Sequence, residues 1–257
     1  MERTFFEWIV YLLQIYWAQF LKGTGTTVLL AVVGTFFGFL IGLVVGVVRT
    51  LPLRRGGETG LTLRLVVLRV VNALLAVYIE VFRGTPMMVQ AMLLFYGIPQ
   101  LTGFQFNSLP AAMLVIVLNT GAYMAEIVRG GIQSVDKGQT EAGKAIGMTH
   151  WQIMVNVVLP QTIRNILPAT GNEFIVNLKD SSVLSIIMVY ELFYAANDVR
   201  AIFYRPFEPY VIAAVIYLIL TFVSSRLLRF LESKMDGPQN FTLIASSTTP
   251  HLLNKKK

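Results

Sequence analysis

The chain has 257 residues, of which 55% are apolar and 14% are charged, and its mean hydropathy is +0.64. A soluble domain of this size carries about 25% charged residues, so much of this surface must face lipid. The absence of cysteine excludes disulfides, thiolate metal sites and cysteine nucleophiles. The two histidines, His150 and His251, form no metal-binding motif, so we expect this chain to bind no metal or other cofactor.

The net charge of +7 comes from basic residues that flank apolar runs. One group lies between residues 49 and 69, and another follows the last apolar run and ends in Lys255-Lys256-Lys257. This distribution is the positive-inside pattern of a membrane protein and not a nucleic-acid-binding face. The start of the chain lacks the features of a removable signal peptide, so we expect the first apolar stretch to be retained.

Residues 1–22 predict an amino-terminal helix that is either amphipathic and interfacial or the outer part of a span. The next segment, 26–48, predicts a span with four glycines at every fourth position. Small residues on one helix face let a second helix approach closely in lipid. These glycines are Gly34, Gly38, Gly42 and Gly46.

After a basic loop at 49–61, residues 63–82 predict a helix that breaks at Arg83-Gly84-Thr85-Pro86 and continues over 87–101. Further spans are predicted over 109–128, 166–192 and 209–231, with polar or mixed-charge segments at 129–165 and 193–208. We therefore expect an all-α transmembrane domain over 23–232 with five core spans, six if the amino-terminal helix also crosses, and a polar cytoplasmic tail over 233–257. Loop charges place the amino terminus outside for five crossings and the carboxyl terminus inside.

Ionisable groups inside spans are costly and mark either a transport pathway or a paired structural site. Their acids and bases together suit a zwitterion, which needs a cation for its carboxylate and an anion for its ammonium. The alternative for each is an interhelical ion pair, such as Glu80 or Glu126 with Arg83. The candidate substrate-binding residues are Arg83, Thr85, Glu126, Asn172, Glu173, Lys179, Asp180 and Ser181.

The segment before the penultimate span reads Glu141-Ala142-Gly143, three residues, Gly147, nine residues, then Val157-Val158-Leu159-Pro160. This resembles the EAA loop of ABC importer permeases, with Gly143 in place of an alanine and Val157 in place of an isoleucine. The residues suggest a helical hairpin, with a short helix over 141–144, a sharp turn at Gly147 and a second helix over 151–158 that Pro160 stops. The ATPase-coupling residues that the resemblance implies are Glu141, Ala142, Gly143, Gly147, Leu159 and Pro160.

Three further blocks resemble the polar amino-acid branch of these permeases: residues 80–90, residues 122–135 and residues 171–182. The resemblance implies the type I importer permease fold, in the bacterial inner membrane, with a coupling loop over 129–165. It also implies three partners: an ATP-binding subunit in two copies, a second permease that is either a copy or a related chain, and an extracellular or periplasmic substrate-binding protein. ATP and Mg would be bound by the ATPase, because this chain has no GxxxxGK[ST] phosphate loop and is not expected to be an enzyme.

Two other function classes fit less of the sequence. An ion-coupled secondary amino-acid transporter would also place charges near the midplane, but it needs no cytoplasmic docking hairpin. An intramembrane enzyme would need a Ser/His, paired-Asp or metal-ligand constellation, and the sequence offers none. We therefore expect the permease subunit of an ABC importer for amino acids, with polar or basic side chains favoured.

Overall fold

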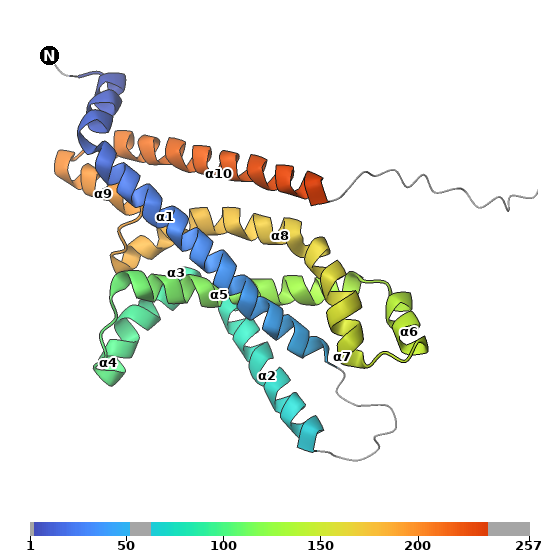
Figure 1. The fold of residues 1–257 in the computed structure, drawn as a ribbon. Helices are drawn as coiled ribbons and strands as arrows, with labels where there is room; N and C mark the ends of the chain where they lie inside the picture. Colours follow the sequence, from blue (N-terminus) through green and yellow to red (C-terminus); the bar gives the residue numbers. More distant parts are fainter. Residues whose placement is uncertain (1–2, 52–62, 236–257) are drawn as a thin grey trace, which may run out of the picture.

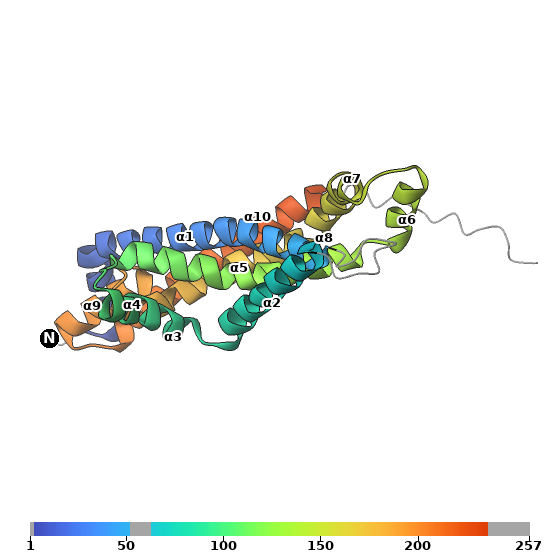
Figure 2. The same ribbon diagram turned by 90° about the horizontal axis from the view of Figure 1, so that it is seen from below.

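The computed structural model describes residues 3–51 and 63–235, and every regular element within those ranges is a helix. Four long helices lie lengthwise in one elongated bundle (Figure 1, Figure 2). These are α1 (Phe5–Thr50), α5 (Ser108–Ser134), α8 (Leu159–Asp180) and α10 (Phe207–Met235). The others are α2 (Leu63–Gly84), α3 (Met87–Met92), the π turn η1 (Leu93–Gly97), α4 (Ile98–Thr102), α6 (Lys137–Ala145), α7 (His150–Ile153), the π turn η2 (Met154–Val158), the 3-10 helix η3 (Ser181–Ile187) and α9 (Leu192–Phe203).

Among the described residues, four helices are long and apolar enough to cross a membrane: α1, α2, α5 and α10. A fifth span is made by His150–Ile187 together with Leu192–Phe203, which are bent by 50° at the break between them. Counting that pair once gives the five spans that the sequence predicts. The hairpin of α6 and α7 lies at one end of the bundle, and α4 and α9 lie at the other (Figure 1).

Helix α1 runs without a break from Phe5 to Thr50, so no helix boundary separates its residues 5–22 from the first predicted span. Its start is fixed by Glu7, whose carboxylate accepts a 2.8 Å hydrogen bond from the Thr4 backbone N–H. At 1.5 Å per residue its 46 residues measure about 69 Å along the helix, more than the roughly 40–45 Å of a whole bilayer. Figure 1 shows that its first turns run in a different direction from the rest.

The glycine face of α1 packs against α5, as the sequence predicts. All four glycines of the stripe are buried. A Cβ added at Gly38 would lie 2.8 Å from the Thr120 side chain, and one at Gly46 would lie 2.7 Å from Val128. Because no side chain could fit there, the stripe permits the close approach of the two helices.

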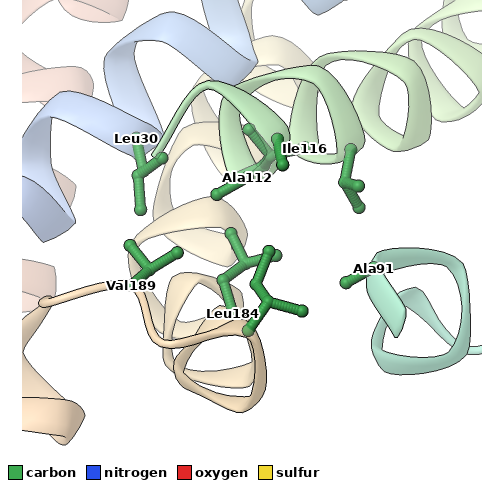
Figure 3. Close-up of a cluster of buried hydrophobic side chains, with 9 residues drawn as sticks. Leu30, Ala91, Ala112, Ile116, Leu184 and Val189 are labelled. Carbon is green, nitrogen blue, oxygen red and sulfur yellow. The ribbon is translucent and has the colours of Figure 1, made fainter. Parts of the chain in front are cut away.

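A small apolar core forms where α1, α3, α5 and the segment after α8 meet. Figure 3 shows Leu30 of α1 and Ala112 and Ile116 of α5 facing Leu184 of η3. Ala91 of α3 closes this cluster from the side. The core therefore ties the short helix after the break in the second predicted span to the end of α8.

The expected loop over 193–208 is wrong in its first part, because residues 192–203 form α9. The carboxylate of Glu191 caps this helix by accepting hydrogen bonds from the backbone N–H groups of Phe193 (2.9 Å) and Tyr194 (2.7 Å). Within the expected span over 166–192, the α-helix stops at Asp180, the 3-10 helix η3 follows to Ile187, and the backbone turns at Met188, whose φ is +61°.

Two segments with sequence expectations lie outside the described residues. They are most of the basic loop, which includes Arg54 and Arg55, and the tail from residue 236 onward.

Candidate functional site

The helix break after α2 is held by two amide side chains. Pro86 has no N–H, so the carbonyl of Phe82, four residues earlier, loses its helical donor. Gln90 supplies a replacement at 3.0 Å and Asn119 of α5 supplies another at 3.2 Å. The amide of Asn119 also donates to the Gln90 side-chain oxygen at 3.0 Å. The backbone carbonyl freed by the break is therefore already occupied by protein donors.

Thr85 is part of the same network. Its hydroxyl donates to the Val81 carbonyl at 2.7 Å and accepts from Gln90 at 2.9 Å. This hydroxyl thus donates one hydrogen bond and accepts one within the break, so the side chain helps to fix the turn.

A cavity of about 470 Å³ lies between α1, α2 and α5 beside this break. Its wall includes Glu80, Arg83 and Gly84 from α2 and Tyr123 from α5. The Arg83 guanidinium lies 5.3 Å from the centre of the Tyr123 ring, within the range of a cation–π contact. Among the described residues Arg83 makes no ion pair within 4 Å, so a cation faces this cavity without a bound carboxylate.

Glu126 lines the same cavity, but two other arginines hold its carboxylate. Arg49 at the end of α1 donates to one oxygen at 2.6 Å. Arg129, one turn further along α5, donates to the other at 2.6 and 3.1 Å. The expected alternative of a Glu126–Arg83 pair is therefore not what forms, although Arg83 lies within electrostatic range of this carboxylate.

The α8 candidates fall into two groups. Glu173 is half-buried, makes no ion pair in the described part of the chain, and lies within electrostatic range of both Arg83 and Asp180. Lys179 and Asp180 are exposed on the last turn of α8, and Asn172 is exposed one residue before Glu173. Arg83 thus lies within electrostatic range of one acid on α5, Glu126, and one on α8, Glu173.

Ser181 is buried and its hydroxyl donates to the Leu178 carbonyl at 2.9 Å, which serves the end of α8.

Two polar clusters escaped the sequence analysis. The buried amide of Asn177 on α8 accepts from Thr120 of α5 and donates to Thr35 of α1, both at 3.0 Å. The carboxylate of Glu191 is fully buried and accepts a 2.7 Å bond from the Tyr217 hydroxyl in addition to capping α9. Both clusters join helices far apart in the chain, and no local pattern marks them.

The hairpin predicted around residues 141–158 is present as α6, a turn, and α7. Gly147 has φ +84°, a left-handed conformation that favours glycine. The backbone N–H of Met148 donates to the Gly143 carbonyl at 3.0 Å, and Thr149 caps α7 by accepting from the Gln152 N–H at 3.3 Å.

Gly143 is buried against Ile153, whose side chain would lie 2.8 Å from an added Cβ, so this glycine lets the two arms meet.

The outer surface of the hairpin carries residues that the motif did not select. Ile146 is 79% exposed and Trp151 is 63% exposed, and Glu141 and Ala142 are exposed as well. The sequence signal for Ile146 and Trp151 is that they are large apolar residues in a polar segment. Exposed side chains of this kind are typical of a contact surface.

The expectation that Pro160 stops the second helix is wrong, because the helix continues into α8. The π turn Met154–Val158 precedes it, and the N–H of Leu159 bonds to the Met154 carbonyl, five residues back. Pro99 shows the same arrangement after Leu93–Gly97, where the N–H of Ile98 bonds to the Leu93 carbonyl. We infer that the wider turn makes room for each proline ring, so that the helix bends without ending.

Comparisons with known proteins agree with this fold. Residues 59–237 match the family of the binding-protein-dependent transport system inner membrane component. The glutamine transport system permease protein GlnP of Escherichia coli (strain K12) is 37% identical over 216 residues, which is 84% of this chain and 92% of that protein. The arginine transport system permease protein ArtQ of Bacillus subtilis (strain 168) is 41% identical over 160 residues, 61% of this chain and 73% of that protein.

Among solved structures, an amino acid ABC transporter crystallised with histidines superposes with a TM-score of 0.76 at 36% identity and covers 91% of this chain and all of that one. An inward-facing MetNI methionine ABC transporter, 22% identical, has a TM-score of 0.62 over 82% of this chain and 95% of that chain, which supports the fold alone. The chain therefore belongs to the family of binding-protein-dependent transport system inner membrane components, the permease subunits of ABC importers.

Proposed function

We propose that this permease carries amino acids, with polar or basic ones preferred, through a path beside the helix break that includes Arg83 of α2 and Glu173 and Asp180 of α8. The observation that carries this proposal is the cavity of about 470 Å³ in which Arg83 has no carboxylate partner among the described residues. An unpaired guanidinium suits a substrate carboxylate, and Glu173 with Asp180 suits the substrate ammonium. The names of the glutamine and arginine permeases support the same class of substrate.

The test uses the purified complex of this chain with its ATPase and substrate-binding protein, reconstituted in vesicles and titrated with the common amino acids. We expect Arg83→Gln, Glu173→Gln and Asp180→Asn each to raise the substrate concentration for half-maximal ATPase stimulation by about tenfold, because each removes one charged contact. Basal ATPase activity should survive. Asp198→Asn is the matched control, since it removes a carboxylate that lies on α9 and not on α5 or α8.

An unchanged response in all three variants, with full stability, would mean that the substrate path lies elsewhere.

We also propose that the α6–α7 hairpin docks on the ATP-binding subunit, present in two copies, and that a second permease completes the path. Glu141, Ala142, Ile146 and Trp151 form its outward surface, while Gly143 and Gly147 shape the turn. Leu159 and Pro160 lie where the hairpin continues into α8, and so would carry its movement to the span. A substrate-binding protein would deliver amino acids at the opposite end, and the ATPase would bind ATP and Mg.

The docking surface can be tested by co-purification with the ATPase. We expect Trp151→Ser and Ile146→Ser to weaken attachment at least about tenfold, because each variant lacks a large apolar side chain that the contact would bury. Leu101→Ser is the matched control: Leu101 is 87% exposed but lies on α4 at the other end of the bundle. Equal attachment of all three variants would exclude this surface as the docking site.

A further inference from the structure

A second cavity, of about 660 Å³, lies between the α6–α7 hairpin and the ends of α1 and α5. Every charged or titratable side chain on its wall is a base: Arg49, Lys137 and His150. Its apolar wall is formed by Val135, Ile153, Met154 and Val158, which belong to one small core. A basic edge beside an apolar wall is the chemistry that binds an amphipathic anion.

Two of the three bases of this cavity have no carboxylate partner among the described residues. Within the described ranges neither Lys137 nor His150 makes an ion pair within 4 Å. Arg49 shares its guanidinium with Glu126, which does not line this cavity. An anion at this place would therefore meet two bases, and no acid among the described residues lines the cavity to repel it.

The ATPase is not the occupant that the geometry favours. The exposed apolar residues of the hairpin, Ile146 and Trp151, do not line the cavity. The cavity is instead shared with Thr50 at the end of α1 and Ile132 at the end of α5, both next to membrane-spanning segments. One face of the hairpin thus remains for the ATPase while the other faces the ends of the spans.

We propose that this cavity binds the headgroup of an anionic phospholipid, with one acyl chain against the apolar wall. The basic loops place this end of the bundle at the cytoplasmic leaflet, where anionic lipids are available. A free inorganic anion would use the bases but not the apolar wall. The bound lipid would lie between the hairpin and the ends of α1 and α5. The position of the hairpin would then depend on membrane composition.

The test uses the whole complex in nanodiscs that contain a trace of photoreactive phosphatidylglycerol or, separately, photoreactive phosphatidylcholine at the same mole fraction. Crosslinked peptides are identified by mass spectrometry. We expect phosphatidylglycerol to label residues 132–140 and 150–158 at least about fivefold more than phosphatidylcholine does, because phosphatidylcholine has no net charge to meet the bases. Lys137→Gln should lower the phosphatidylglycerol labelling about fivefold, and Lys137→Arg should restore it.

Arg164→Gln is the matched control, because Arg164 is an exposed base on α8 that does not line the cavity. Its labelling should equal that of the unaltered complex. Equal labelling by the two lipids, or labelling that Lys137→Gln leaves unchanged, would overturn the proposal. So would loss of labelling in millimolar inorganic phosphate, which points to a free anion, or labelling that appears only after the ATPase is removed, which points to an acidic group of that subunit.

Discussion

Glu126 is held by two guanidinium groups, and this arrangement makes its loss a matter of stability. Replacing its carboxylate leaves Arg49 and Arg129 close together without the anion that bridges them at 2.6 Å on each side. Hydrogen bonds to charged groups contribute about 1.5–3 kcal/mol each, less where the side chains are partly exposed as here. We therefore expect Glu126→Gln to lower the free energy of unfolding by about 1–3 kcal/mol, measured by thermal unfolding in detergent.

Glu80→Gln provides the control, since Glu80 lines the same cavity but makes no ion pair among the described residues. If the two variants unfold at the same temperature and only Glu126→Gln alters the substrate response, Glu126 binds substrate and is not a structural residue.

The candidate residues themselves could be chosen from the sequence, because charges in apolar runs are rare, but their partners could not. The partner of Glu126 on α1 is Arg49, 77 residues away, and no local spacing connects them. The same holds for Asn119, which reaches back 37 residues to the Phe82 carbonyl. The missing N–H of Pro86 indicates that the Phe82 carbonyl needs another donor, but it does not indicate which side chain supplies it.

At the scale of elements, the contact between α1 and α5 depends on the absence of side chains. A methyl group at Gly42 would overlap Met124 and lie 2.8 Å from the backbone nitrogen of Ala125. We expect Gly42→Ala to destabilise the protein by about 1–3 kcal/mol, because the helices must move apart to admit it. Gly25→Ala is the control on the same helix, since a Cβ there meets nothing within 4 Å.

Thermal unfolding in detergent compares the two variants directly. If Gly42→Ala unfolds at the same temperature as Gly25→Ala, the helices can adjust at no cost and the stripe is not the determinant of their packing.

The long apolar runs predicted the spanning helices well. The positions at which these helices are interrupted were predicted less well. The break at Arg83–Pro86 follows from Gly and Pro and is present. Pro160 carries the same breaking signal but stands in a continuous helix, because the π turn before it accommodates the ring. Helix α9 was missed since its charges resemble a loop, whereas its buried side, which includes Leu192, Ala196 and Val199, becomes visible only against α1 and α10.

For the whole molecule, the two ends of the bundle should lie on opposite sides of the membrane. The chain has no cysteine, so a single one can be introduced without a competing thiol. We expect a membrane-impermeant maleimide to label Asn107→Cys, between α4 and α5, from the outside only. Gln139→Cys, on α6, should be labelled only after the cytoplasmic side is opened. Labelling of position 139 from outside would contradict the inner-membrane orientation that the loop charges predict.

The buried bond between Asn177 and its two threonines also has a consequence in time. Thr35 and Thr120 are made before Asn177, by 142 and 57 residues of chain. At roughly 5–20 residues per second, synthesis reaches Asn177 about 7–28 s after Thr35 and about 3–11 s after Thr120. During that interval both hydroxyls lack their final partner, so α1 and α5 must stay together through their other contacts, which are the glycine stripe, the apolar core around Leu30 and the Arg49–Glu126 ion pair. The arrival of α8 then locks a pair of helices that the nascent chain has already assembled.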